Sequence, residues 1–125
     1  LKYKIVRFAD ELTQVETEMV DDANIVVIAY GTTARAARQA VHMAREKRVR
    51  AGLIRPITIW PFPQEKIRNI LATAKRALMV ELNMGQIVTE IERIAPHTCK
   101  IHQLNRYDGE VINPVEIYKR ILEVK

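Results

Sequence analysis

The sequence predicts a domain of the α/β class, with a mainly parallel sheet of about four strands that alternate with helices. Residues 25–30 form a continuous apolar run rich in β-branched side chains, which is typical of a strand buried on both faces. Gly31 then permits a sharp turn, and residues 37–44 place alanines and a valine at helical spacing. This order of strand, turn and helix recurs along the chain, which favours parallel strands joined by right-handed crossovers.

The length and composition fit one domain spanning residues 1–125. The chain has 125 residues, of which 48% are hydrophobic and 28% are charged, so it can form a core without disulfides. No apolar run reaches the roughly 18 residues of a membrane span, and no charged-then-apolar leader is visible, so we expect a cytoplasmic protein. The chain begins with Leu1 rather than Met, so we expect it to be a fragment of a longer protein.

Apolar periodicity also predicts the remaining elements. A helix is expected over about residues 3–20, because apolar residues recur there at spacings of three and four. The other predicted elements are strands at 51–55, 77–82 and 100–105, and helices at about 63–75, from 87 up to Pro96, and from Pro114 onward with Asn113 as the cap. The strand at 100–105 alternates more than the others, so we expect it near an edge of the sheet.

The turn Gly31-Thr32-Thr33 is the first candidate site. Its backbone N–H groups open a helix and can hold a phosphate or a carboxylate. Thr32 or Thr33 is expected to cap that helix by accepting a backbone hydrogen bond. The turn lacks the glycine patterns of nucleotide-binding loops, so a tight turn before a capped helix is the simpler interpretation.

Two charged residues lie near the ends of predicted strands. Glu81 lies inside an apolar strand, where a carboxylate needs a partner or a water-filled crevice. Arg55 has a similar position on the second strand. An ion pair between Glu81 and Arg55 is one interpretation, and a carboxylate facing a substrate or another subunit is the other.

Basic side chains form a stripe along the predicted helix that begins after Gly31, in a chain whose net charge is +5. Arg35, Arg38, His42 and Arg45 recur at spacings of three and four, opposite the alanines. Such a stripe is either a solvent-exposed face or a docking face for an acidic partner or a diphosphate. Aromatic residues make up 6% of the chain, too few for the stacking platforms of single-strand binders, so nucleic acid is not favoured.

The metal-ligating residue types form no site in this sequence. The single cysteine, Cys99, excludes a disulfide or a CxxC metal site within the chain. His42, His97 and His102 have no metal-ligand spacing. From its residues alone, the chain shows no complete catalytic set.

The loop RPITIWPFP holds three prolines and two large aromatic residues. Pro61 and Pro63 stiffen the chain around Trp60 and Phe62. We expect Trp60 and Phe62 to lie at an interface or to shield a crevice, because proline rigidity lowers the cost of presenting apolar groups. Packing of both rings on the domain's own core is the alternative.

Three segments carry a family resemblance: AYGTTARAARQAVHMAREK, GLIRPITIWPFP and ELNMGQ. In this order they resemble the carboxyl-terminal domain of the α subunit of 2-oxoacid:ferredoxin oxidoreductases, nearest the 2-oxoglutarate type, over about residues 22–123. The resemblance implies a three-layer α/β/α fold similar to the carboxyl-terminal domain of transketolase, with strand order 2-1-3-4. The turns at 31–33 and 83–86 would then lie side by side at the switch point of the sheet.

The resemblance also implies an enzyme that uses thiamine diphosphate, magnesium, iron–sulfur clusters and coenzyme A. None of these cofactors has its motif here, so we expect this chain to bind none of them and to be inactive alone. It would be a structural and docking domain whose partners are the other α-subunit domains and a β subunit. Ferredoxin would be a partner of the whole enzyme. Formation of a homo-oligomer is left open. The candidate interface residues of the second turn are Asn83, Met84, Gly85 and Gln86.

A second hypothesis is a free-standing, flavodoxin-like binding module. It would use the basic surface on nucleic acid or on an acidic partner. A basic patch clustered on one face would favour it, and a longer reading frame would favour the enzyme domain.

Overall fold

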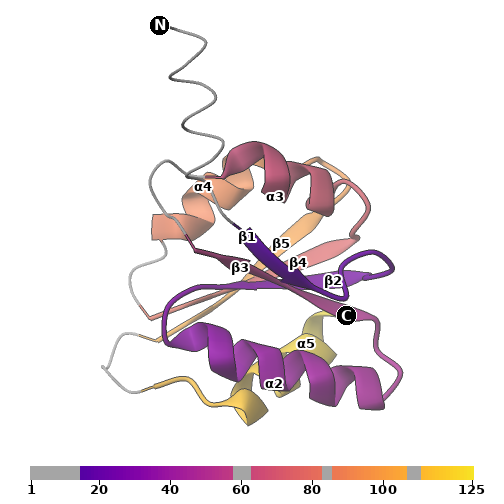
Figure 1. Ribbon diagram of the computed structural model, residues 1–125, viewed down its shortest axis with the longest axis vertical. Coiled ribbons are helices and arrows are strands. Elements are labelled where there is room, and N and C mark those ends of the chain that lie inside the picture. Colours follow the sequence, from indigo (N-terminus) through magenta and orange to yellow (C-terminus); the bar gives the residue numbers. More distant parts are fainter. Residues whose placement is uncertain (1–14, 58–62, 83–85, 107–110) are drawn as a thin grey trace, which may run out of the picture.

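The computed structural model describes residues 15–57, 63–82, 86–106 and 111–125. These residues form one five-stranded sheet with helices on both faces, in the order β1-β3-β2-β4-β5 (Figure 1). The strands are β1 (Val15–Glu18), β2 (Ile25–Ala29), β3 (Ala51–Pro56), β4 (Arg76–Glu81) and β5 (Lys100–Asn105). The helices are α2 (Thr33–Glu46), α3 (Gln64–Leu71), α4 (Gln86–Ile94) and α5 (Pro114–Val124).

The four predicted strands occur in the predicted order. They correspond to β2, β3, β4 and β5, and β2 pairs in parallel with β3 on one side and β4 on the other. β5 pairs in parallel with β4 and lies at an edge of the sheet, as its alternating sequence predicted. The α/β/α class and the parallel core of the sheet are therefore confirmed.

The sheet has a fifth strand that the sequence did not predict. Val15–Glu18 was expected to end a helix over residues 3–20, but it forms β1, antiparallel to β3. This part of the helix prediction is wrong, and residues 1–14 lie outside the described part of the chain. The reason lies in tertiary structure, because β1 pairs with the edge of β3 that β2 leaves free. This long-range pairing outweighs the local helical spacing of apolar residues on which the prediction was based.

The core has two layers, one on each face of the sheet. α2 and α5 cover one face and α3 and α4 cover the other (Figure 1). The predicted α2 stripe is fully buried, since its four residues have no exposed surface: Ala37, Ala40, Val41 and Ala44. Side chains from β2 alternate between the layers, with Val27 in one and Val26 in the other, so β2 is the buried centre of the fold.

Helix ends follow the sequence where a capping side chain is present. The Asn113 side chain accepts a hydrogen bond from the Glu116 backbone N–H, and Pro114 begins α5, as predicted. α3 ends at Leu71, earlier than predicted, although Ala74 is still buried beyond it. Among the described residues, the helices are all too short or too polar to span a membrane.

Candidate functional site

The switch point of the sheet lies between β2 and β4. The chain leaves β2 toward α2 on one face and leaves β4 toward α4 on the other, at the carboxyl ends of these neighbouring strands (Figure 1). Ala29 pairs in register with Val80, which brings the starts of the two following turns to the same edge of the sheet. The predicted neighbourhood of the two strands is thus confirmed. Asn83, Met84 and Gly85 lie outside the described residues, so the geometry of their turn stays a prediction.

Gly31 makes the first turn possible. Its φ is +63°, in the left-handed region that residues with a Cβ adopt at a cost. The Thr33 hydroxyl donates to the Tyr30 carbonyl at 2.7 Å, which ties the start of α2 to the end of β2. The backbone N–H of Ala34 donates to the Gly31 carbonyl at 3.2 Å and closes the turn.

The predicted threonine cap of α2 is wrong. Thr32 occupies the N-cap position but makes no side-chain capping bond. Its φ of −68° and ψ of −23° are already helical, whereas a capping residue usually adopts an extended backbone that turns its hydroxyl toward the helix. Thr33 is buried and its hydroxyl donates backward rather than accepting. The amino end of α2 therefore lies at this edge of the sheet without a side-chain cap.

Glu81 caps the helix on the other side of the switch point. Its side chain is 1% exposed, and its two carboxylate oxygens accept hydrogen bonds from the backbone N–H groups of Ile87 at 3.0 Å and Val88 at 3.4 Å. These N–H groups belong to the first turn of α4, where no earlier residue of the helix can accept from them. The positive end of the helix dipole also favours a carboxylate there.

The alternative ion pair between Glu81 and Arg55 is not formed. β2 lies between the strands that carry them, and the two side chains leave opposite faces of the sheet, since Leu53 and Met79 belong to different core layers. Arg55 instead contacts Glu16 on β1 at 3.3 Å. Sequence reasoning missed this partner because Glu16 was assigned to a helix.

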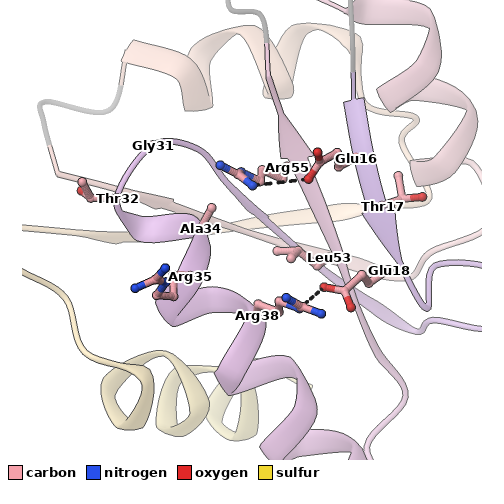
Figure 2. A pocket seen from close by; sticks show the side chains of 10 residues that line it. All are labelled: Glu16, Thr17, Glu18, Gly31, Thr32, Ala34, Arg35, Arg38, Leu53 and Arg55. Atoms are coloured by element: carbon pink, nitrogen blue, oxygen red, sulfur yellow. Dashed lines mark hydrogen bonds and ion pairs between the residues drawn. The ribbon is translucent and has the colours of Figure 1, made fainter.

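A pocket of about 940 Å³ lies beside the Gly31 turn, between α2 and the outer strands (Figure 2). Arg38 of α2 reaches Glu18 of β1 at 2.8 Å, and Arg55 reaches Glu16 across the two strands. Arg35 has no ion pair among the described residues, and Figure 2 shows its side chain away from both pairs. Among the described residues, the pocket thus combines two ion pairs with one arginine, Arg35, that has no ion pair. Glu16 and Glu18 line this pocket although neither was a candidate in the sequence analysis.

The basic stripe of α2 is largely paired with the segment that contains β1. Besides Arg38, His42 lies 3.5 Å from Glu18, and Arg45 binds Asp22 through both carboxylate oxygens, at 2.6 and 3.0 Å. The hydrogen bond from Arg45 lowers the pKa of Asp22 below its ordinary value. Three of the four stripe residues therefore fasten α2 to this segment, and Arg35 stays available.

The side chains described above do not fit two of the cofactor sites that the resemblance implies, a magnesium–diphosphate site and an iron–sulfur cluster. The pocket carboxylates, Glu16 and Glu18, both face arginines, and the Glu81 oxygens face backbone N–H groups, so these residues do not fit a magnesium–diphosphate site. Cys99 is buried, and burial raises the pKa of its thiol, which does not fit an iron–sulfur ligand. Within the described ranges, no cluster of three or more potential metal ligands occurs.

Two other candidates cannot be placed. Trp60 and Phe62 lie outside the described residues, so their expected interface role stays a prediction. Gln86 is the first residue of α4, at the switch-point edge.

The fold and this edge define a doubly wound α/β domain with its candidate site at the switch point. Residues 23–117 match the family model described as pyruvate:ferredoxin oxidoreductase core domain II. The chain belongs to this family, and the expected kinship with an α-subunit domain of 2-oxoacid:ferredoxin oxidoreductases, nearest the 2-oxoglutarate type, is confirmed.

Curated relatives match almost the whole chain. The 2-oxoglutarate synthase subunit KorA of Methanothermobacter marburgensis is 38% identical over 122 residues, which are 98% of this chain and 32% of that protein. The ketoisovalerate oxidoreductase subunit VorB of Methanothermobacter thermautotrophicus is 37% identical over 124 residues, covering 99% of this chain and 35% of that protein. The chain therefore spans about a third of the length of these relatives.

A solved structure has the same fold. It is a 2-oxoglutarate:ferredoxin oxidoreductase from Magnetococcus marinus with 2-oxoglutarate, coenzyme A and succinyl-CoA bound. It matches with a TM-score of 0.82 and 22% sequence identity, over 98% of this chain and 21% of that chain. This similarity shows the fold of the domain.

Proposed function

We propose that this chain is a structural and docking domain of the α subunit of a thiamine-diphosphate-dependent 2-oxoacid:ferredoxin oxidoreductase. The whole enzyme would convert a 2-oxoacid, coenzyme A and oxidised ferredoxin to acyl-CoA, carbon dioxide and reduced ferredoxin. The names of the relatives support this reaction class, and KorA supports the 2-oxoglutarate type. The family match favours this reading over a free-standing binding module.

The single observation that carries the docking role is the tie between the end of β4 and the start of α4. Glu81, the last residue of β4, accepts hydrogen bonds from the backbone N–H groups of Ile87 and Val88 in the first turn of α4 through its buried carboxylate. The pairing of Ala29 with Val80 puts the end of β4 at the same edge of the sheet as the end of β2. Preorganised elements lose little entropy when they meet a partner, which supports a contact surface at this edge, to which Asn83, Met84, Gly85 and Gln86 would belong.

The assembled enzyme would supply what this domain lacks. Thiamine diphosphate, magnesium, iron–sulfur clusters and coenzyme A would be held by other domains and subunits. The partners of this domain would be the remaining α-subunit domains and a β subunit. Ferredoxin would accept electrons from the whole complex, which would be cytoplasmic. Trp60 and Phe62 would belong to the same contact surface.

Turnover by the purified chain tests this proposal. The chain would be mixed with 2-oxoglutarate, thiamine diphosphate, magnesium, coenzyme A and a redox dye, and the reduction of the dye would be followed. We expect no turnover by the chain alone and turnover by the assembled enzyme. Reduction of the dye by the chain alone would contradict the docking role.

A further inference from the structure

A second pocket lies at the opposite end of the sheet from the switch point. It has a volume of about 500 Å³ and lies where β2, β3 and β4 begin, so we call it the amino-edge pocket. Its charged lining residues all carry positive charge: Arg48, Arg50, Lys75, Arg76 and Lys125. They come from two loops, the first residue of β4 and the residue after α5, so the fold gathers them from distant parts of the sequence.

Among the described residues, no side-chain carboxylate lines the amino-edge pocket, and Arg48, Lys75 and Arg76 make no ion pair. Arg50 binds a neutral group, since the Asn24 side-chain oxygen accepts from it at 3.1 and 3.3 Å when the amide is oriented to satisfy both residues. The charge of Arg50 contributes to lowering the pKa of Asp22, but the Asp22 carboxylate is already bound by Arg45. Like charges that share a concave site repel one another, so a bound anion would lower the energy of this arrangement.

Arg48 occupies a position that the backbone does not favour for arginine. Its φ is +63°, and it follows the last turn of α2. The N–H of Arg48 donates to the Arg45 carbonyl at 2.9 Å, and that of Val49 donates to the Ala44 carbonyl at 2.9 Å. This pair of bonds is the Schellman motif, in which glycine is the usual residue at the left-handed position. Arginine is therefore present there at a conformational cost.

We propose that the amino-edge pocket binds a compact multivalent phosphate group, either an inorganic polyphosphate or the phosphate end of a nucleotide. Three of its five cations are arginines, whose planar forks bind phosphate oxygens in pairs. A pocket of about 500 Å³ falls within the size range of small-molecule sites. This site is separate from the docking edge, because it lies at the other end of the parallel strands.

A structural explanation competes with this one. α2 and α5 both end beside the pocket, and cations near helix carboxyl ends stabilise the helix dipole (Figure 1). On that explanation the cations would serve folding and would bind no ligand. The variant Arg48→Gly, which relieves the backbone and removes a charge, distinguishes the two explanations. A ligand site predicts weaker phosphate binding by this variant, whereas a purely structural role predicts a change in stability alone.

The test is titration of the 125-residue chain, labelled with ¹⁵N, with tripolyphosphate and separately with adenosine triphosphate. Sulfate at matched ionic strength is the control for general screening. We expect saturable binding, with amide shifts confined to residues 24–25, 48–50, 75–76 and 125. Arg48→Gly and Arg76→Gln should each weaken binding about tenfold, the effect of losing charge-assisted hydrogen bonds. Lys119→Gln removes the same charge from an exposed site on α5 and should change binding less than twofold or so.

The two ligands distinguish the source of the phosphate. Equal affinity for both would assign the site to the phosphates alone, and tighter binding of the nucleotide would assign it to a nucleotide. Absence of saturable binding, equal weakening by Lys119→Gln, or tighter binding of an oligoglutamate peptide than of tripolyphosphate would overturn the proposal. Unchanged affinity in an Arg48→Gly variant that is more stable than the wild type would also overturn it.

Discussion

The Glu81 carboxylate binds the backbone N–H of Ile87 across the turn that joins β4 to α4, with an oxygen-to-nitrogen distance of 3.0 Å. Val88 donates to the second oxygen at 3.4 Å, and the whole side chain is buried. A buried carboxylate is costly unless it is fully hydrogen-bonded, and here the helix end supplies the donors. One residue thereby ends β4 and caps the start of α4.

Replacing Glu81 with glutamine should destabilise the domain. The amide keeps one acceptor, but it loses the charge and turns an NH₂ group toward a backbone N–H, so we expect a loss of about 2 kcal/mol. Urea unfolding followed by circular dichroism measures it. The matched control is Glu92→Gln on the exposed face of α4, which should change stability by less than about 0.5 kcal/mol. Equal losses in the two variants would contradict the capping role.

Gly52 and Gly31 should respond differently to substitution, because different constraints act on them. A Cβ at Gly52 would lie 2.8 Å from the Met19 carbonyl oxygen and 3.0 Å from the Val20 Cα, and neither backbone atom can move freely. Gly52→Ala should therefore cost about 1–3 kcal/mol. A Cβ at Gly31 would meet no atom within 4 Å, so only its φ of +63° matters, and Gly31→Ala should cost about 1 kcal/mol.

The control for the glycine pair is asparagine, which tolerates the left-handed region. Gly31→Asn should be more stable than Gly31→Ala, and Gly52→Asn should be no better than Gly52→Ala. Thermal unfolding of the four variants checks both statements. A Gly52→Ala variant as stable as the wild type would show that the β1–β2 connection does not lie against β3.

His102 should make stability fall as the pH drops below neutrality. Burial, followed by the charges of Lys100, Arg120 and Arg76, lowers the pKa of His102 below its ordinary value of 6.5. The unfolded chain then binds a proton at this residue before the folded chain does. Stability is full above pH 6.5 and is lost progressively as the pH falls from there toward the lower pKa of the folded state.

Denaturant midpoints between about pH 7.5 and 5.5 measure this dependence, in a range above most carboxylate titrations. His102→Gln should flatten the slope in this window. His97→Gln, at an exposed position, should leave the slope of the wild type intact. An unchanged slope in His102→Gln would refute the assignment.

Arg45 should not tolerate replacement by lysine. Its guanidinium donates to two backbone carbonyls, Ala51 at 2.7 Å and Met19 at 2.8 Å, besides binding Asp22. A lysine cannot reach these acceptors in the same fork geometry, so Arg45→Lys should cost about 1–2 kcal/mol. Arg38→Lys is the control, because Arg38 is exposed and contacts only Glu18 among the described residues, and it should cost less than about 0.5 kcal/mol. Equal unfolding midpoints for the two variants would contradict this role of Arg45.

The parts of the fold that the sequence predicted are those with local signals. The buried strand at Ile25, the alanine face of α2 and the Asn113 cap each depend on residues close together in the chain. β1 was mistaken for a helix because its four residues, VETE, carry no strand signal of their own. Only pairing with β3, more than 30 residues away, defines it.

The candidate site was predicted in part for the same reason. The neighbouring strands at the switch point followed from the family resemblance, and their pairing is confirmed. The partners of Glu81 and Arg55 were not predicted, because each depends on which face of the sheet the side chain leaves. A carboxylate at a strand end shortly before a helix start was the signal that could have identified the Glu81 cap.

Gln86→Ala in the assembled enzyme tests the docking role most directly. Both the activity and the association of the α and β subunits would be measured, together with the melting temperature of the isolated domain. Gln39→Ala, at an exposed position on α2, is the matched control. The account predicts impaired activity or association for Gln86→Ala, with a melting temperature close to that of the wild type. A lower melting temperature in an otherwise normal enzyme would show that the turn serves only the fold, and would contradict the account.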